Sequence, residues 1–451
     1  MRQLQIRAVS HEAAFLHDIG GVCIVDWQSK TYGVVLGGGG AKGAYQIGVW
    51  RAMKETGIRY GGLIGTSVGS LNATLFALGD LDVAEHLWRS MRVEEVLGIN
   101  AGLPGDEQES RWAANWKLTR KFARNGTFSM EPLRKLLKAH VNESKVRAAC
   151  MPLGLVTWSL TAMKPVVAFL EDIPVGKLHD YLLASCCLPV FDNRLMNGER
   201  FLDGSVYDNL PVEPLYQRGF HDIISIDLSA MGHVREFMAP DLHHERIRSA
   251  ESLGGLLHHN PLLCERNLFL GYTDAMKHFG SLSGHRYTFT GLTGEELRPV
   301  NLRFDLNPGE KAAVHELSDM AIMRLIRAIQ GASGTGETTM DGVREIAADL
   351  LNIPRHIIRA PGSLEGEIRR ELVRLSHADS LRQQARSRVS MKALAAFLKN
   401  SAEQPQISAI TLLMDYGLGQ AFWEALAFGR PEWVVGIWYL RHLRAKEDRD
   451  D

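Results

Sequence analysis

The chain has 451 residues, of which 45% are apolar and 23% are charged, so its composition is that of a globular protein with room for more than one domain. Its formal net charge is −1 and its pI is about 7.0, which excludes a global electrostatic attraction to nucleic acid or to anionic membranes. No apolar run approaches the roughly 20 residues of a membrane-spanning helix. The first residues lack the apolar core of a signal peptide, so we expect a cytoplasmic protein.

The first structural pattern is an apolar run at 32–36, followed by four glycines and a segment with helical spacing. A second apolar run at 61–67 leads into the helical pattern VGSLNATLFALGD. Two successive strand, turn and helix units predict a parallel sheet with helices on its faces. Further strands are expected in LGLVTWSLTAMKPVVAFLED, in RFLDGS and at 222–229, which extends the α/β core to about residue 230.

The remaining sequence predicts a different kind of structure. Residues 231–330 contain a histidine-rich loop region, a strand candidate HRYTFT and the helical pattern PGEKAAVHELSDMAIMRLIRAIQ. The stretch 331–339 has the Gly/Ser/Thr composition of a linker, and mainly helical patterns follow it. We therefore expect an N-terminal extension (1–30), a catalytic domain (31–330), a linker (331–339) and a mainly helical C-terminal region (340–451).

The glycine run allows more than one interpretation. A GxGxxG frame fits Gly38, Gly40 and Gly43, but the next strand lacks the acidic residue that a dinucleotide-binding fold places there. The Walker frame fails because no Ser or Thr follows the lysine. Glycines at a helix N-terminus can also direct several backbone N–H groups at one oxyanion. A purely structural turn stays open for this loop.

Two further motifs carry candidate catalytic side chains. The GxSxG motif from Gly65 to Gly69 places Ser67 between an apolar strand and a helix, the context in which such a serine is exposed as a nucleophile. A serine hydroxyl also needs a base and an oxyanion hole. Asp203, which precedes Gly204 at the end of a short strand, is a candidate base, although Asp-Gly pairs most often only form turns.

In this order, the three motifs resemble those of the patatin-like phospholipases. That family has a GGGx[KR]G loop, a GxSxG nucleophile and a downstream DG[GA] aspartate, and this chain has GGGAKG at 38–43, GTSVG at 65–69 and DGS at 203–205. The segment ASCCLPVF is also similar to the family's ASxAxPxxF, and the likeness covers roughly 32–230. Ser205 departs from the usual glycine or alanine, and its hydroxyl would lower the basicity of Asp203 slightly through a hydrogen bond.

The resemblance implies a patatin-like three-layer α/β fold with a mostly parallel central sheet, and a phospholipase A or lysophospholipase activity without metal or cofactor. It implies a dyad of Ser67 as nucleophile and Asp203 as general base. The remaining motif residues would be the oxyanion donors Gly38, Gly39 and Gly40 and the turn glycines Gly43, Gly65, Gly69 and Gly204. Lys42 is either a solvated side chain or a cation for the substrate phosphate.

Other interpretations stay open. One is an α/β-hydrolase-type esterase with a Ser, Asp, His triad that uses His221 or His233, and another is a catalytically silent module that binds an anion at the glycine loop. Between 366 and 399, eight Lys/Arg and three Asp/Glu alternate with apolar residues. This basic segment could pack on the catalytic domain, contact the inner membrane face as a peripheral element, or mediate homo-oligomerisation. The expected partner is a phospholipid or lysophospholipid substrate, not nucleic acid.

Overall fold

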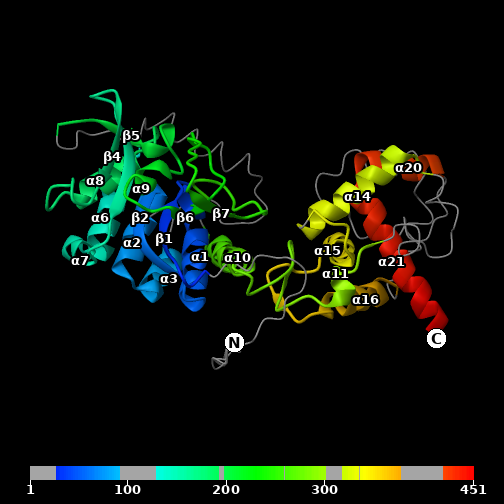
Figure 1. Cartoon of the computed structure of the whole chain (residues 1–451). Coiled ribbons are helices and arrows are strands. Elements are labelled where there is room, and N and C mark those ends of the chain that lie inside the picture. The colour runs from blue at the N-terminus through cyan, green and yellow to red at the C-terminus, as the bar shows by residue number, and fades with distance from the viewer. Residues whose placement is uncertain are drawn as a thin grey trace.

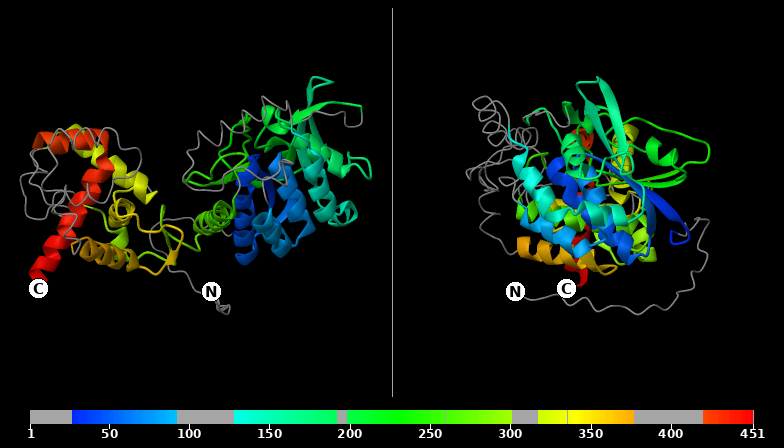
Figure 2. Two further views of the ribbon diagram at one scale, coloured as in Figure 1. Left: turned by 180° about the vertical axis from the view of Figure 1, so that it is seen from behind. Right: turned by 90° about the vertical axis from the view of Figure 1, so that its left-hand side faces the viewer.

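The computed structural model describes residues 27–91, 128–191, 198–258, 260–300, 317–334, 336–376 and 420–450. An α/β part and a helical part lie side by side, and the helix α10 lies in the α/β part where the two meet (Figure 1). Figure 2 shows the same two parts from behind and from one side. The seven-stranded sheet belongs to the first part, and the second part contains the C-terminal helices and a two-stranded sheet of β8 and β9.

One mostly parallel sheet organises the α/β part. Its strand order is β4-β3-β2-β1-β6-β7, and β5 pairs with β3. The β1, β2, β3, β6 and β7 strands pair in parallel, whereas β4 and β5 run antiparallel to β3. The strands are β1 Thr31–Leu36, β2 Arg59–Thr66, β3 Leu153–Ser159, β4 Lys164–Phe169, β5 Phe201–Asp203, β6 Asp222–Asp227 and β7 His243–Arg248.

Both faces of the sheet are covered, which explains the continuous apolar runs of its central strands. Val34 and Leu36 of β1 belong to the large cluster on one face, and Val35 belongs to a smaller cluster on the other. This gives the expected mostly parallel sheet between helices. The elements of this part are α1 Ala44–Glu55, α2 Val68–Leu78, α3 Leu81–Ser90, α6 Glu131–His140, α7 Glu143–Ala148, α8 Leu178–Ser185, α9 Glu213–Tyr216, α10 Pro261–His278 and the 3₁₀ turns η1 Gly40–Gly43 and η2 Gly204–Val206.

Two elements lie where the sequence predicted only loops. The edge strand β7 falls in the histidine-rich region, and only Ile247 of its residues is buried, so the apolar signal of a strand is missing there. The helix α10 begins after Asn260, whose side chain accepts a hydrogen bond from the Leu263 N–H. It packs along α1 and so adds to the helices that cover this face of the sheet.

The helical part has its own hydrophobic cluster, which extends from Tyr287 to Leu443. The helix α14 continues through Ser333, and Thr339 caps α15, so the stretch 331–339 joins two helices that pack on each other. We therefore propose a domain boundary between Phe279 and Tyr287 rather than at 331–339. The elements are β8 Thr288–Phe289, α11 Gly294–Leu297, α14 Asp319–Ser333, α15 Met340–Leu350, β9 Ile358–Arg359, α16 Ser363–Ser376, α20 Gln420–Gly429 and α21 Pro431–Asp450.

The basic segment is described only as far as Ser376. There the apolar side chains Leu364, Ile368 and Leu372 of α16 are buried in the cluster of the helical part, so this face of α16 packs within the protein. The rest of the segment, 377–399, lies outside the described residues. No helix within the described ranges is both long and apolar enough to span a membrane.

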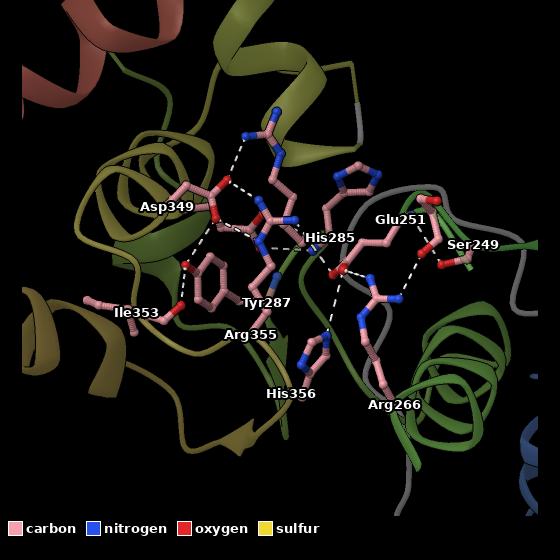
Figure 3. Close-up of polar contacts among 12 residues, drawn as sticks. Ser249, Glu251, Arg266, His285, Tyr287, Asp349, Ile353, Arg355 and His356 are labelled. Atoms are coloured by element: carbon pink, nitrogen blue, oxygen red, sulfur yellow. Dashed lines mark hydrogen bonds and ion pairs between the residues drawn. The ribbon is translucent and has the colours of Figure 1, made fainter. Parts of the chain in front are cut away.

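An ion-pair network joins the two parts (Figure 3). Glu251, in the loop before α10, contacts Arg266 of α10 at 2.5 Å and both Arg355 and His356 of the helical part at 3.6 Å. Burial would raise the pKa of Glu251, but these partners lower it to about 2. The carboxylate is therefore ionised at neutral pH and holds a charged contact at the junction.

Candidate active site

The backbone at Ser67 has the strained geometry of a nucleophile elbow. This residue lies between β2 and α2 with φ 55° and ψ −128°, and 8% of its surface is exposed. A positive φ is unfavourable for a residue with a Cβ, so it persists only where the surrounding structure enforces it. Such a turn lifts a hydroxyl out of the strand direction at the helix N-terminus.

The turn leaves no room for a Cβ at the positions two residues before and two residues after the serine. A Cβ at Gly65 would lie 2.2 Å from the backbone carbon of Gly69, and one at Gly69 would lie 2.0 Å from the Leu36 oxygen. Ser185 fixes the elbow from α8, because its Oγ accepts the Ser67 N–H at 2.9 Å. No local sequence pattern marks Ser185, because only the fold brings it next to Ser67.

The register of β3 explains why Asp203 lies beside the elbow. Along one edge of β3, Val156 pairs with Thr66 at the end of β2, and the next residue, Thr157, pairs with Asp203 in β5. The short strand β5 thus takes over the edge of β3 where β2 ends. This change of partner places the candidate base next to the residue that follows Thr66, which is Ser67.

The Asp203 carboxylate is almost completely buried, with 1% of the residue exposed. Its Oδ1 accepts the Ser205 N–H at 2.9 Å, and Oδ2 is a buried acceptor with no hydrogen-bond partner among the described residues. Burial raises the pKa of Asp203, and the hydroxyls of Ser67 and Ser205 partly counter that rise because they can donate to the charged form. A raised pKa makes this carboxylate a better proton acceptor than a solvated one.

This pKa predicts the acidic limb of the activity profile. If Asp203 is the base, kcat/KM falls as the pH drops through its raised pKa, so the limb lies above the ordinary aspartate value of 3.8. Replacing Ser205 with alanine removes a donor to the ionised form, so the limb should move to still higher pH. The measurement is kcat/KM against pH on a water-soluble short-chain ester. A limb at or below 3.8, or one that moves down in the variant, contradicts the assignment.

The glycine loop is held at both ends by backbone contacts. The Gly37 N–H donates to the Ile226 oxygen at 3.0 Å, and the Ala41 N–H donates to the Leu256 oxygen at 2.8 Å. The Gly38 N–H is also engaged, because it donates to Oδ1 of Asn209 at 3.1 Å. Of the three expected donors, only the N–H groups of Gly39 and Gly40 therefore lack a partner within the described part of the chain.

The side-chain ammonium of Lys42 is bound by backbone oxygens of the protein. Its Nζ donates to the backbone oxygens of Leu228 at 3.3 Å and Ser229 at 3.1 Å, which ties the glycine loop to the end of β6. Burial lowers the pKa of Lys42, and the nearby charge of Asp227 partly offsets that effect. These contacts assign the ammonium a structural role, and contact with a substrate phosphate stays a prediction.

An apolar cavity of about 120 Å³ begins at Ser67 and Gly40. Its lining comes mainly from leucines of α2, of α6 and of the loop that holds Ala41; they include Leu71, Leu75, Leu133, Leu136, Leu137 and Leu256. Such a lining suits a hydrocarbon chain, with the Ser67 hydroxyl at its polar end.

The two histidines considered for a triad do not contact the serine. His221 pairs with Asp241 at 3.0 Å and precedes β6, whose other end lies next to the glycine loop. His233 is exposed, and its backbone joins Ser205 to Asn209. Throughout the described ranges, no histidine hydrogen-bonds to Ser67, and no group of three potential metal ligands is found.

The fold and the site together define an α/β protein with a serine elbow, a buried aspartate and a glycine-rich turn. Residues 34–216 match the family model of the patatin-like phospholipases. The chain therefore carries a patatin-like phospholipase domain, and this domain includes all three motifs.

Comparison with curated proteins agrees with this domain. Lysophospholipase NTE1 of Cryptococcus neoformans is 29% identical over 207 residues, which are 45% of this chain and 11% of that protein. The same-named protein of Phaeosphaeria nodorum is 30% identical over 207 residues, or 45% of this chain and 12% of its own length. The likeness is thus confined to a small part of these relatives. The crystal structure of VipD from Legionella pneumophila aligns with 90% of this chain and 91% of its own at 16% identity and a TM-score of 0.37.

Proposed function

We propose that this chain hydrolyses acyl esters of phospholipids or lysophospholipids, with Ser67 as nucleophile and Asp203 as base. The observation that carries the proposal is the serine elbow at the end of an apolar cavity, beside a buried carboxylate of which one oxygen has no hydrogen-bond partner among the described residues. The patatin-like phospholipase domain and the relatives named lysophospholipase support a lipid ester as the substrate.

In the proposed reaction, Asp203 accepts the Ser67 proton while Oγ attacks the ester carbonyl carbon. The carbonyl oxygen becomes an oxyanion, which the N–H groups of Gly39 and Gly40 bind. The C–O bond to the leaving alcohol then breaks, and the alcohol takes the proton from Asp203. Water repeats the attack on the acyl serine with Asp203 as base again, which releases the fatty acid and restores the Ser67 hydroxyl.

The deciding experiment combines chemical labelling with a substrate panel. A fluorophosphonate should label the purified protein, and mass spectrometry should place the adduct on Ser67. Fatty-acid release is then measured on phospholipids, lysophospholipids and triacylglycerols, and we expect the first two classes to be cleaved faster. A protein that neither reacts with the phosphonate nor cleaves any ester would instead support the anion-binding module.

The cavity predicts how acyl-chain preference changes. Leu136 of α6 is half-buried and lines the cavity, so Leu136→Trp should shorten the space for the chain. We expect kcat/KM for a long-chain ester to fall about tenfold or more, which corresponds to the loss of a few buried methylene groups, while a short-chain ester is affected little. Kinetics on a series of chain lengths measures this.

The matched control is Leu262→Trp, because Leu262 is 69% exposed on α10 and does not line the cavity. It should leave the chain-length profile unchanged. If Leu136→Trp lowers the rates on all chain lengths by the same factor, the cavity is not the acyl site.

A further inference from the structure

Asn209 is a buried amide whose side chain meets the glycine loop. It is 1% exposed and lies six positions after Asp203 in the segment that follows η2. The Gly38 N–H donates to Oδ1 of Asn209 at 3.1 Å and to the Asn209 backbone oxygen at 3.3 Å, whereas Nδ2 of Asn209 donates to the Gly38 oxygen at 3.4 Å. One side chain therefore pairs with both backbone polar groups of a single glycine.

This pairing fixes the direction of the next N–H group. The Gly38 carbonyl and the Gly39 N–H belong to one planar trans peptide, so they point in opposite directions. Because Asn209 holds the carbonyl oxygen, the Gly39 N–H points away from Asn209. The Gly39 N–H is one of the two loop donors without a partner in the part of the chain that the structure describes.

The same short segment also contacts the elbow. The backbone oxygen of Asp208 accepts a hydrogen bond from Oγ1 of Thr66 at 2.8 Å, one residue before Ser67. The Asn209 N–H in turn donates to the His233 oxygen at 2.6 Å, which anchors the segment to the loop after β6. Asp208 and Asn209 thus connect η2, the turn that follows Asp203, to the serine elbow and to the glycine loop.

A residue that merely filled space here would not need an amide. A Cβ on Gly38 would lie 2.4 Å from Asn209 Oδ1, and one on Gly232 would lie 3.0 Å from Asn209 Cβ, so the amide is enclosed by backbone on two sides. A buried side-chain amide is stabilising only when both its N–H donor and its oxygen acceptor have hydrogen-bond partners. The backbone N–H and carbonyl of Gly38 satisfy both.

We propose that Asn209 is a positioning residue for the oxyanion hole, acting by holding the Gly38 carbonyl so that the Gly39 N–H faces the developing oxyanion. This inference rests on the proposed ester hydrolysis. Loss of the amide lets the peptide between Gly38 and Gly39 rotate. The consequence is weaker stabilisation of the transition state with little change in binding of the ground-state lipid.

The test is Asn209→Ala, assayed on a short-chain ester for kcat and KM and with a trifluoromethyl ketone that forms an oxyanion adduct on the serine. We expect kcat to fall about 30-fold or more, within the range for loss of one oxyanion donor, and KM to change less than about threefold. The inhibition constant of the ketone should rise by the same factor as kcat/KM falls.

Asn209→Asp is the second variant, because it keeps the acceptor for the Gly38 N–H, removes the donor to the Gly38 carbonyl and introduces a carboxylate beside the glycine loop. It should lose at least as much kcat as Asn209→Ala, and it carries the test alone if the alanine variant does not fold. Asn142→Ala, which removes the N-cap of α7 through the side chain that accepts the Lys145 N–H, is the control for a purely structural loss.

The proposal is overturned if both Asn209 variants keep kcat within about threefold of wild type, if their loss is no larger than that of Asn142→Ala, or if only KM changes. Wild-type protein without activity on any ester would instead refute the proposed function, so the two failures are distinguishable.

Discussion

Ser67→Ala is expected to abolish ester hydrolysis, with a fall in kcat on the order of 10⁴-fold or more, as for other serine nucleophiles. The variant keeps the glycine loop and the cavity but has no atom that can form the acyl intermediate. Fatty-acid release from the most rapidly cleaved lipid measures the loss, and labelling by the fluorophosphonate should disappear in parallel. Equal release by variant and wild type would refute the assignment of the nucleophile.

Ser67→Gly separates activity from stability at the same position. Glycine adopts positive φ without steric cost, whereas a residue with a Cβ at such a backbone angle costs roughly 1–3 kcal/mol. The glycine variant should therefore be as inactive as the alanine variant, yet its unfolding temperature should be equal to or higher than that of the alanine variant. A marked fall in the unfolding temperature of both variants would mean that lost folding, rather than a lost nucleophile, explains the inactivity.

Asp203→Asn is expected to lower kcat by roughly 10³- to 10⁴-fold, as for loss of the acidic partner in other serine hydrolases. The amide has almost the same shape and can still accept the Ser205 N–H, but it cannot take the Ser67 proton. Because the substitution removes a buried charge, the free energy of unfolding should stay equal or rise. Steady-state kinetics and thermal unfolding of the same preparation measure both effects.

His221→Ala and His233→Ala distinguish a dyad from a triad. Neither side chain hydrogen-bonds to Ser67, so each variant should keep kcat within about twofold of wild type. A large loss in one of them, together with an active Asp203→Asn protein, would support the triad and end the dyad.

The sequence predicted the elements that combine an apolar run with a turn motif. The strand that ends before Ser67 was found because buried parallel strands are continuous apolar runs. The short antiparallel strand at Asp203 was found from the Asp-Gly turn that follows it. The edge strand β7 was missed for the opposite reason, since its partly exposed residues are mainly charged. The composition of 331–339 is that of a linker, although α14 continues through Ser333, Thr339 caps α15, and the two helices pack on each other.

The supporting residues of the site could not be found from sequence. Ser185 and Asn209 act through contacts with Ser67 and Gly38, from which they are separated by 118 and 171 positions. Such pairs are set by the order of strands in the sheet, and no local pattern reports them. The engagement of the Gly38 N–H was hidden likewise, because the motif shows which glycines are present but not which amides already have partners.

The anchoring of the glycine loop has a consequence for substrate binding. Gly37, Gly38 and Ala41 donate to Ile226, Asn209 and Leu256, which belong to three separate segments. The two amides left between them are therefore ordered before any lipid arrives, and their conformational entropy is lost during folding rather than at the encounter with substrate. In the proposed reaction, such preorganised dipoles need no rearrangement as the oxyanion forms, so the binding energy of the acyl chain would be available for drawing the ester into place.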